Sequence, residues 1–357
     1  MTTNSMSALG GTNAVNAPLA SGQARRLDVD WALTMWPLVA ALGVAITLFA
    51  GPRLFGSIFV LDLWCLGYQH VVATFSRIGF DLKDVRDNRR LVVDTPVFIF
   101  VLTATVSLHA GSWLVATTYF YWQFFHYTRQ AFGISKYFAA TEAVAASVVS
   151  QGSFALYAVA VATFAWRLSQ GPDRLLGMPV WSVPVPATAA LACLAVAALA
   201  VVNWAVATKR SGLQHTRYSY FLLSALCVLG IGYVAMRNMN ESWLVVNVWH
   251  NLQYIIFVWK SNIKRFRDGE DKNHPMLSYI CQPRRAWLYV ATMLGISSLL
   301  YGQVALLDGA LRRNGIALTI AFYMTLNFHH YVVDGLIWKR RRKTTVPIAV
   351  QAVPHAG

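Results

Sequence analysis

Long apolar runs dominate the sequence, and short polar or basic stretches separate them. Each run is about 20 residues or longer, which is the length that an α-helix needs to cross the hydrocarbon core of a bilayer. Because backbone polar groups in lipid must be satisfied within their own segment, every such run is expected to be helical. The pattern predicts ten spans, near residues 31–50, 54–79, 91–110, 113–137, 148–168, 185–207, 217–236, 243–262, 286–306 and 315–339.

Lysine and arginine are distributed unevenly between the two ends of these spans. If the N-terminus is cytoplasmic, 24 of the 30 basic residues lie in cytoplasmic regions and 6 lie on the opposite side. The last span also ends in Trp338 and five cations, Lys339 to Lys343, which is typical of a cytoplasmic boundary. The asymmetry predicts that both termini are cytoplasmic.

Composition agrees with a polytopic membrane protein. Of the 357 residues, 56% are hydrophobic and only 13% are charged, whereas soluble domains carry about 25% charged residues. We therefore expect an all-α transmembrane bundle in a bacterial-type inner (plasma) membrane, with one domain over 31–340. Residues 1–30 are expected to form a disordered N-terminal tail, and 341–357 a basic and then flexible C-terminal tail.

The net charge of +15 lies in short loops between apolar runs. This placement favours attraction to anionic membrane lipid and excludes nucleic acid as the expected partner. The four cysteines form no CxxC pair, so neither a disulfide framework nor a cysteine metal site is expected.

Five of the nine histidines lie inside predicted spans, namely His70, His126, His250, His329 and His330. Their four spans run in the same direction, so depth can be compared by counting toward the cytoplasmic end. His126, His250 and His329 each lie ten residues before a lysine, and His70 lies seven before Arg77. Ten residues of helix rise about 15 Å, half the hydrocarbon thickness. The spacing predicts one layer of imidazoles near the middle of the membrane.

Ionisable groups at this depth are costly and are functional candidates. Neutral imidazole is a common ligand of Fe, Cu and Zn, so the layer predicts a metal centre of one or two ions. Of the adjacent pair we favour His330 as a ligand, because Asp334 follows it by four residues and can ligate or orient it. His329 is a further candidate. Arg129 is expected to pair with Asp334 and close the site on its cytoplasmic side.

Polar residues that could orient the imidazoles occur at helical spacing. Gln123 and Gln130 flank His126, and Asn247 and Gln253 flank His250. A tyrosine follows closely after several histidines, and these tyrosines are interpreted as packing residues: Tyr127, Tyr254 and Tyr331.

Three functions are compatible with such a layer. The first is an oxygenase that uses non-haem iron (Fe²⁺) to oxidise a lipophilic small molecule arriving from the bilayer. The second is a haem-binding electron-transfer protein, although no helix carries two spaced histidine layers. The third is a proton-coupled transporter that uses the intramembrane histidines and aspartate. Copper and zinc stay open as alternatives to iron.

The HxxxH and HxxHH boxes of membrane desaturases are absent, but another family has a similar histidine pattern. His330-Tyr-Val-Val-Asp334 resembles the closing segment of the Brp/Blh family of bacterial membrane β-carotene 15,15′-dioxygenases. His126, in Phe-His-Tyr-Thr-Arg-Gln-Ala-Phe-Gly, is similar to the second histidine segment of that family. His250 would then stand for the third histidine, and His70, in Gly-Tyr-Gln-His, for the first.

The resemblance covers four short segments and implies an iron held by these four histidines and oxidative attack on a polyene. The chain departs from the family in several places. Span two lacks Pro-His-Gly, and Thr74 stands where the family has a carboxylate. No second histidine follows His250 in its segment, and the chain has additional spans.

Overall fold

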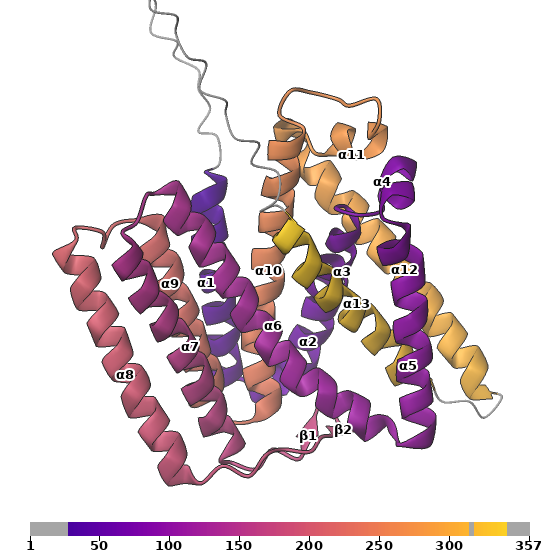
Figure 1. The fold of residues 1–357 in the computed structure, drawn as a ribbon. Coiled ribbons are helices and arrows are strands. Elements are labelled where there is room, and N and C mark those ends of the chain that lie inside the picture. The colour runs from indigo at the N-terminus through magenta and orange to yellow at the C-terminus, as the bar shows by residue number, and fades with distance from the viewer. Residues whose placement is uncertain (1–27, 314–317, 341–357) are drawn as a thin grey trace, which may run out of the picture.

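The computed structural model describes residues 28–313 and 318–340, and nearly all of its regular structure is helical (Figure 1). The long helices are α1 (Val29–Ala50), α5 (Thr95–His109), α6 (Ser112–Thr141), α7 (Ala146–Leu168), α8 (Ala187–Arg210), α9 (Arg217–Gly230), α10 (Met239–Arg265), α12 (Ala286–Arg313) and α13 (Thr319–Arg340). The shorter helices are α2 (Phe55–Asp62), α3 (Tyr68–Phe75), α4 (Leu82–Asp87) and α11 (Pro275–Ile280).

Five further segments are 3₁₀- or π-helical. The 3₁₀ turns are η1 (Pro52–Leu54) and η5 (Pro283–Arg285), and the π segments are η2 (Leu63–Gly67), η3 (Arg90–Asp94) and η4 (Ile231–Ala235). In each π segment the backbone passes directly into or out of an α-helix. The second predicted span is therefore one continuous helical segment with a π insertion just before His70.

In the described part of the chain each of the ten predicted segments is largely helical, so the all-α prediction is confirmed. The structure adds one element that the apolar pattern did not predict, an antiparallel hairpin of β1 (Arg174–Leu175) and β2 (Met178–Pro179). Its turn has positive φ at Leu176 and Gly177, and the glycine adopts φ +81° without steric cost.

Among the described residues, seven helical segments are long and apolar enough to cross a membrane. They are Val29–Ala50, Pro52–Phe75, Arg90–His109, Ala146–Leu168, Ala187–Arg210, Arg217–Ala235 and Pro283–Leu311. The three other long helices are α6, α10 and α13. These are the helices that carry His126, His250, and His329 with His330, and their polar residues lower the hydropathy. On α6 and α10 many of these polar residues are buried inside the bundle, among them Gln123, Asn247 and Gln253.

The predicted tails lie almost wholly outside the described residues. Only residues 28–30 of the predicted N-terminal tail are described, and Val29 and Asp30 belong to α1. The predicted C-terminal tail, 341–357, is outside the described range.

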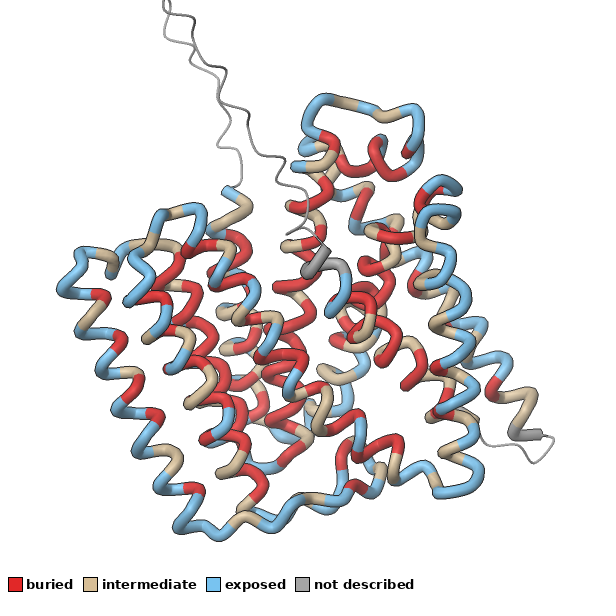
Figure 2. The backbone as a smooth tube through the Cα atoms, viewed as in Figure 1, coloured by how far each residue is buried: buried red, intermediate tan, exposed pale blue. Residues whose placement is uncertain are grey.

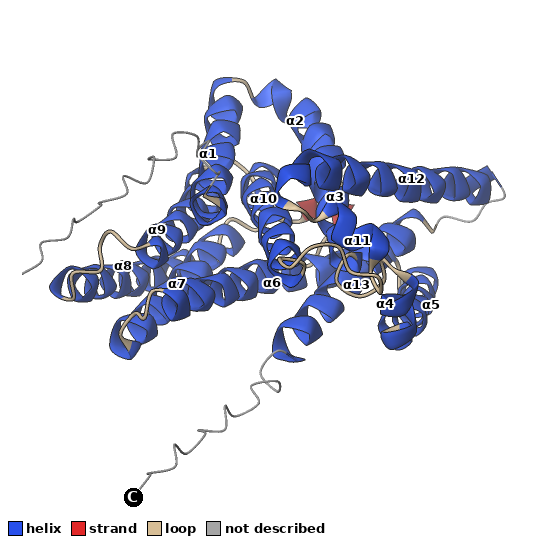
Figure 3. Cartoon of the chain, turned by 90° about the horizontal axis from the view of Figure 1, so that it is seen from above, coloured by secondary structure: helices blue, strands red, loops and turns tan. Residues whose placement is uncertain are grey.

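Helix α10 lies near the middle of the bundle, and α8 and α12 lie at opposite edges (Figure 3). On one side α7 packs on α8 and α9, and α1 packs on α9 and α10. On the other side α13 packs on α3, α5 and α6, and α12 packs on α3. Burial follows the same order, because α10 is the most continuously buried helix whereas α8 is largely exposed (Figure 2). The buried polar groups described below lie around α10.

Local sequence signals account for where several helices begin. The side chain of Asp28 accepts hydrogen bonds from the first amides of α1, Thr216 does so for α9, and Asn238 for α10. Such caps satisfy backbone donors that have no partner within the helix. Gly111, at φ +94°, makes the tight connection between α5 and α6. The starts of α6 and α10 fix the axial positions of His126 and His250 on their helices.

We expect alanine in place of Gly152 to destabilise the protein, whereas alanine in place of Gly43 should not. A Cβ at Gly152 would collide with the hydroxyl of Tyr218 and lie 2.7 Å from Leu222, because α7 and α9 pack closely there. Overpacking of this kind costs about 1–3 kcal/mol. Nothing lies within 4 Å of a Cβ at Gly43. Alanine there causes no clash, and its higher helix propensity should stabilise the helix. Thermal unfolding of both variants in detergent tests the difference, and equal midpoints would contradict the close packing.

Candidate metal centre

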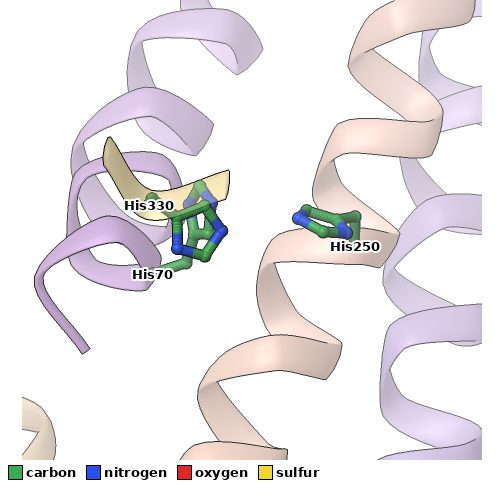
Figure 4. Close-up of side chains that lie close together, drawn as sticks. All are labelled: His70, His250 and His330. Atoms are coloured by element: carbon green, nitrogen blue, oxygen red, sulfur yellow. The ribbon is translucent and has the colours of Figure 1, made fainter. Parts of the chain in front are cut away.

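Helices α3, α6, α10 and α13 run in the same direction through the bundle (Figure 1). Each carries one of the histidines His70, His126, His250 and His330, and all four side chains are at most 6% exposed. The structure brings these four residues together. His250 projects from α10 toward His70 and His330 (Figure 4).

The four imidazole rings form a closed cycle. The centroid distances are 4.7 Å from His70 to His330 and 4.9 Å from His330 to His126. They are 5.0 Å from His126 to His250 and 5.4 Å from His250 to His70. Neighbouring rings meet edge to face, at interplanar angles between 73° and 87°. Side chains from four separate helices therefore converge on one small volume.

The nitrogen atoms have the spacing that a shared ion requires. One ring nitrogen from each of His70, His250 and His330 lies within 4.8 Å of the other two. The Nε2 atoms of His126 and His330 are 3.1 Å apart. Two adjacent ligands about 2.1 Å from one ion are separated by about 3.0–3.4 Å, depending on the coordination angle. The donor set fits a transition metal ion, and all of its members are neutral nitrogen ligands.

His70, His330 and His250 differ in the hydrogen bonds that their ring nitrogens make. His70 Nδ1 lies 2.6 Å from the carbonyl oxygen of Gly67, at the end of the π segment η2. His330 Nδ1 lies 2.6 Å from Oγ1 of Thr74. A bond from Nδ1–H to an oxygen leaves Nε2 bare, which is how metal-binding histidines are commonly oriented. Among the described residues, His250, only 1% exposed, has no hydrogen-bond partner at either nitrogen. A buried polar group without a partner is costly, and a bound ion is one group that could satisfy it.

Asp334 is joined to this cycle through other side chains. Its Oδ1 accepts a hydrogen bond of 2.8 Å from the hydroxyl of Tyr254. The Tyr254 hydroxyl in turn lies 3.1 Å from Oγ1 of Thr74. One oxygen of Asp334 also lies within 4.8 Å of nitrogens of His126 and His330. The carboxylate is therefore close enough to bind an ion on that side, and Tyr254 and Thr74 connect it to His330.

His329 lies apart from the cycle. Its Nε2 is 2.6 Å from the carbonyl oxygen of Leu91 in η3, and its ring stacks on Phe75 at 5.1 Å. Successive helical residues point about 100° apart, so only one of the adjacent pair can face the centre. His330 is that residue, and His329 links α13 to the π segment η3.

Arg129 does not form the predicted ion pair with Asp334. Its guanidinium donates to the hydroxyl of Tyr157 at 3.0 Å and lies over the ring of Phe132, on an exposed part of α6. Arg129 is three residues from His126 and so lies about 60° away around the helix. That rotation, together with the tilt of α6, carries the side chain outside the bundle.

A second polar network lies beside His250, on the side opposite Asp334. The amide of Asn247 donates to Asp62 at 2.6 Å, and Tyr127 donates its hydroxyl to Asn247. Gln123 also contacts Tyr127 and accepts from Trp243 at 2.6 Å. The ring of Tyr127 packs on His250 at 4.2 Å. The interpretation of Tyr127 and Tyr254 as packing residues is therefore incomplete, since both hydroxyls also form hydrogen bonds with buried polar groups.

Two features of the structure had no clear sequence signal. Thr74 is a threonine in an apolar run, and only its spacing of four after His70 and its place at the carboxylate position of the resembled family single it out. His274 lies in a predicted loop, outside the ten predicted spans. It contacts Asp84 at 3.1 Å and Asp271 at 2.8 Å, and Arg265 contacts the same Asp84 oxygen. The Asn273 amide and His274 hold the pKa of Asp271 below its ordinary value. This ion cluster joins the loop before α11 to α4, so His274 has a structural role.

The chain matches no protein-family model, and no similar protein was found among curated proteins or solved structures.

Proposed function

We propose that this chain is an integral-membrane oxygenase that holds a non-haem iron ion with His70, His126, His250 and His330. The observation that carries the proposal is the convergence of four buried imidazoles, one of which has no other partner. Buried imidazoles in a membrane bundle are costly to retain, so a ligand that satisfies all four explains why they meet.

The resemblance of the histidine segments to the Brp/Blh dioxygenases favours iron over copper and zinc. Imidazole by itself suits all three metals. When bound, iron would supply the reaction with O₂. The residues of the chain would hold the ion, keep bulk water away and position the substrate.

Haem is less compatible with the geometry than a bare ion. Neighbouring rings of the cycle touch at centroid distances of 4.7–5.4 Å. A haem held by two axial histidines places a wide porphyrin between them. Rings in mutual contact leave no slot for that plane, which supports a bare ion.

A lipophilic substrate is supported by the aromatic residues beside His126. The ring of Tyr331 stacks on His126 at 4.3 Å, and Trp122 stacks on Phe328 at 5.2 Å. Phe125, one residue before His126, is 55% exposed on the outer face of α6. An apolar wall of this kind suits a flat, lipid-like molecule that arrives from the bilayer, such as an isoprenoid.

The topology that we propose has ten spans with both termini cytoplasmic, in a bacterial-type inner membrane. The 24 to 6 division of basic residues supports this orientation. In this topology α6, α10 and α13 cross the membrane together with the seven more apolar segments. Their polar faces then lie in the bundle interior, around the histidine cycle.

Metal analysis combined with absorption spectroscopy tests the proposal. Protein purified anaerobically in detergent is expected to contain stoichiometric iron without a Soret band. It should consume O₂ when supplied with membrane lipid extract from the source cells. A Soret band, or a purified and folded protein that binds neither iron nor another transition metal, would overturn the assignment.

A further inference from the structure

A polar layer lies one helical turn beyond the histidines on three helices. Thr74 follows His70 by four residues, Tyr254 follows His250 by four, and Asp334 follows His330 by four. Because α3, α10 and α13 run in the same direction, the three side chains lie at similar depth, about 6 Å further along the bundle. They are hydrogen-bonded to each other and are all at most 6% exposed.

The hydrogen bonds in this layer have a single consistent direction. The Asp334 carboxylate only accepts, so the Tyr254 hydroxyl donates to it, over 2.8 Å. Tyr254 has no second proton, so the Thr74 hydroxyl donates to Tyr254, over 3.1 Å. The Thr74 oxygen is then an acceptor toward His330, and its 2.6 Å contact with Nδ1 is a bond donated by Nδ1–H. The oxygen of Asp334 that accepts from Tyr254 thereby favours a proton on Nδ1 of His330.

We infer that Thr74 and Tyr254 are positioning residues that, together with Asp334, keep Nε2 of His330 free of a proton and directed at the ion. The inference rests on the proposed metal centre for its function, but the tautomer itself does not depend on a metal. His70 reaches the same state by a simpler route, since its Nδ1 faces the Gly67 carbonyl, which can only accept. His330 needs the three-residue chain because a hydroxyl alone can either donate or accept.

Removing the Tyr254 hydroxyl is expected to reverse the tautomer. In Tyr254→Phe, the Thr74 hydroxyl loses its acceptor and can turn to donate to His330 Nδ1. The proton of His330 then moves to Nε2, which points at His126 Nε2, 3.1 Å away, and can no longer bind an ion. Thr74→Val removes the acceptor of Nδ1–H and has the same consequence for the ion. Thr74→Ser keeps the hydroxyl and should behave like the wild type.

The first experiment reads the tautomer in metal-free protein by solid-state NMR of ¹⁵N-labelled histidine. Signals of His330 are assigned by their loss in His330→Gln. The expected result is a protonated Nδ1 and a bare Nε2 in the wild type and in Thr74→Ser, with the opposite assignment in Tyr254→Phe. A bare Nδ1 in the wild type, or an unchanged tautomer in Tyr254→Phe, would overturn the inference. Because no metal is present, the result is independent of the proposed iron centre.

The second experiment measures Fe²⁺ affinity by competition with a chelator. Loss of a residue that orients a ligand typically lowers metal affinity by about 10–100-fold, and this is expected for Tyr254→Phe and Thr74→Val. Tyr218→Phe is the matched control, because its buried hydroxyl contacts Val148 in a different part of the bundle. Thermal unfolding confirms that each variant is folded. Wild-type affinity in Tyr254→Phe would contradict the inference even if iron binds, whereas no binding to any variant or to the wild type would contradict the proposed function.

Discussion

Alanine in place of His250 is expected to lower the affinity for iron by more than about 100-fold, because changes in the groups that only orient a ligand already cost 10–100-fold. His250 is the imidazole of the cycle whose nitrogens have no hydrogen-bond partner among the described residues, so its removal would delete a proposed ligand without breaking a hydrogen bond seen there. Iron per chain, measured by mass spectrometry of detergent-purified protein, should fall accordingly, and O₂ consumption should fall with it.

Two further histidines serve as controls for this experiment. His215→Ala changes an exposed loop residue whose ring contacts Tyr220, and His329→Ala changes a buried residue that binds Leu91 outside the cycle. Both variants should retain iron at the wild-type level. His274 is unsuitable as a control, because it belongs to the ion cluster around Asp84. Equal iron content in His250→Ala and His215→Ala would contradict the ligand assignment.

Ferrous iron is expected to stabilise the metal-free protein against thermal unfolding. An ion that binds the folded state alone adds about 4 kcal/mol of stability at a free concentration 1,000-fold above its dissociation constant. In this protein the gain has a definite origin, since the ion would satisfy His250 and join α3, α6, α10 and α13. The unfolding midpoint of chelator-treated protein should rise by several degrees on addition of Fe²⁺.

Specificity of this stabilisation can be checked with the same variants. His250→Ala should show little response to Fe²⁺, whereas His329→Ala should respond like the wild type. Mg²⁺ should have no effect, since it prefers oxygen ligands and the cycle offers nitrogen. A comparable rise with Mg²⁺, or in His250→Ala, would mean that iron acts elsewhere on the protein.

The axial positions of the histidines were predictable from the sequence. Apolar runs marked the helices, and α-helical rise is nearly constant, so counting residues from the basic ends placed His126 and His250 at one depth. The structure has these rings 5.0 Å apart. The same reasoning favoured His330 over His329, because Asp334 lies one turn beyond His330 and a partner at that spacing shares its face.

The rotation and tilt of the helices could not be predicted from the sequence in the same way. The π segment η2 places an extra residue per turn just before His70, which changes the face that the following residues present. The tilt and neighbours of α6 set Arg129 against Tyr157 and not Asp334. Apolar periodicity is weak in a helix surrounded by lipid and protein together, so it does not report these rotations.

The sequence by itself determined the helical class, the approximate positions of the helices and the common axial position of the imidazoles, because each depends on residues close together in the chain. Only the tertiary structure decided that His126, His250, His70 and His330 form one cycle and that a chain of hydrogen-bonding side chains connects Asp334 to His330. Those contacts join residues on separate helices, up to 256 positions apart. Their geometry depends on how the helices rotate and pack, which local spacing does not encode.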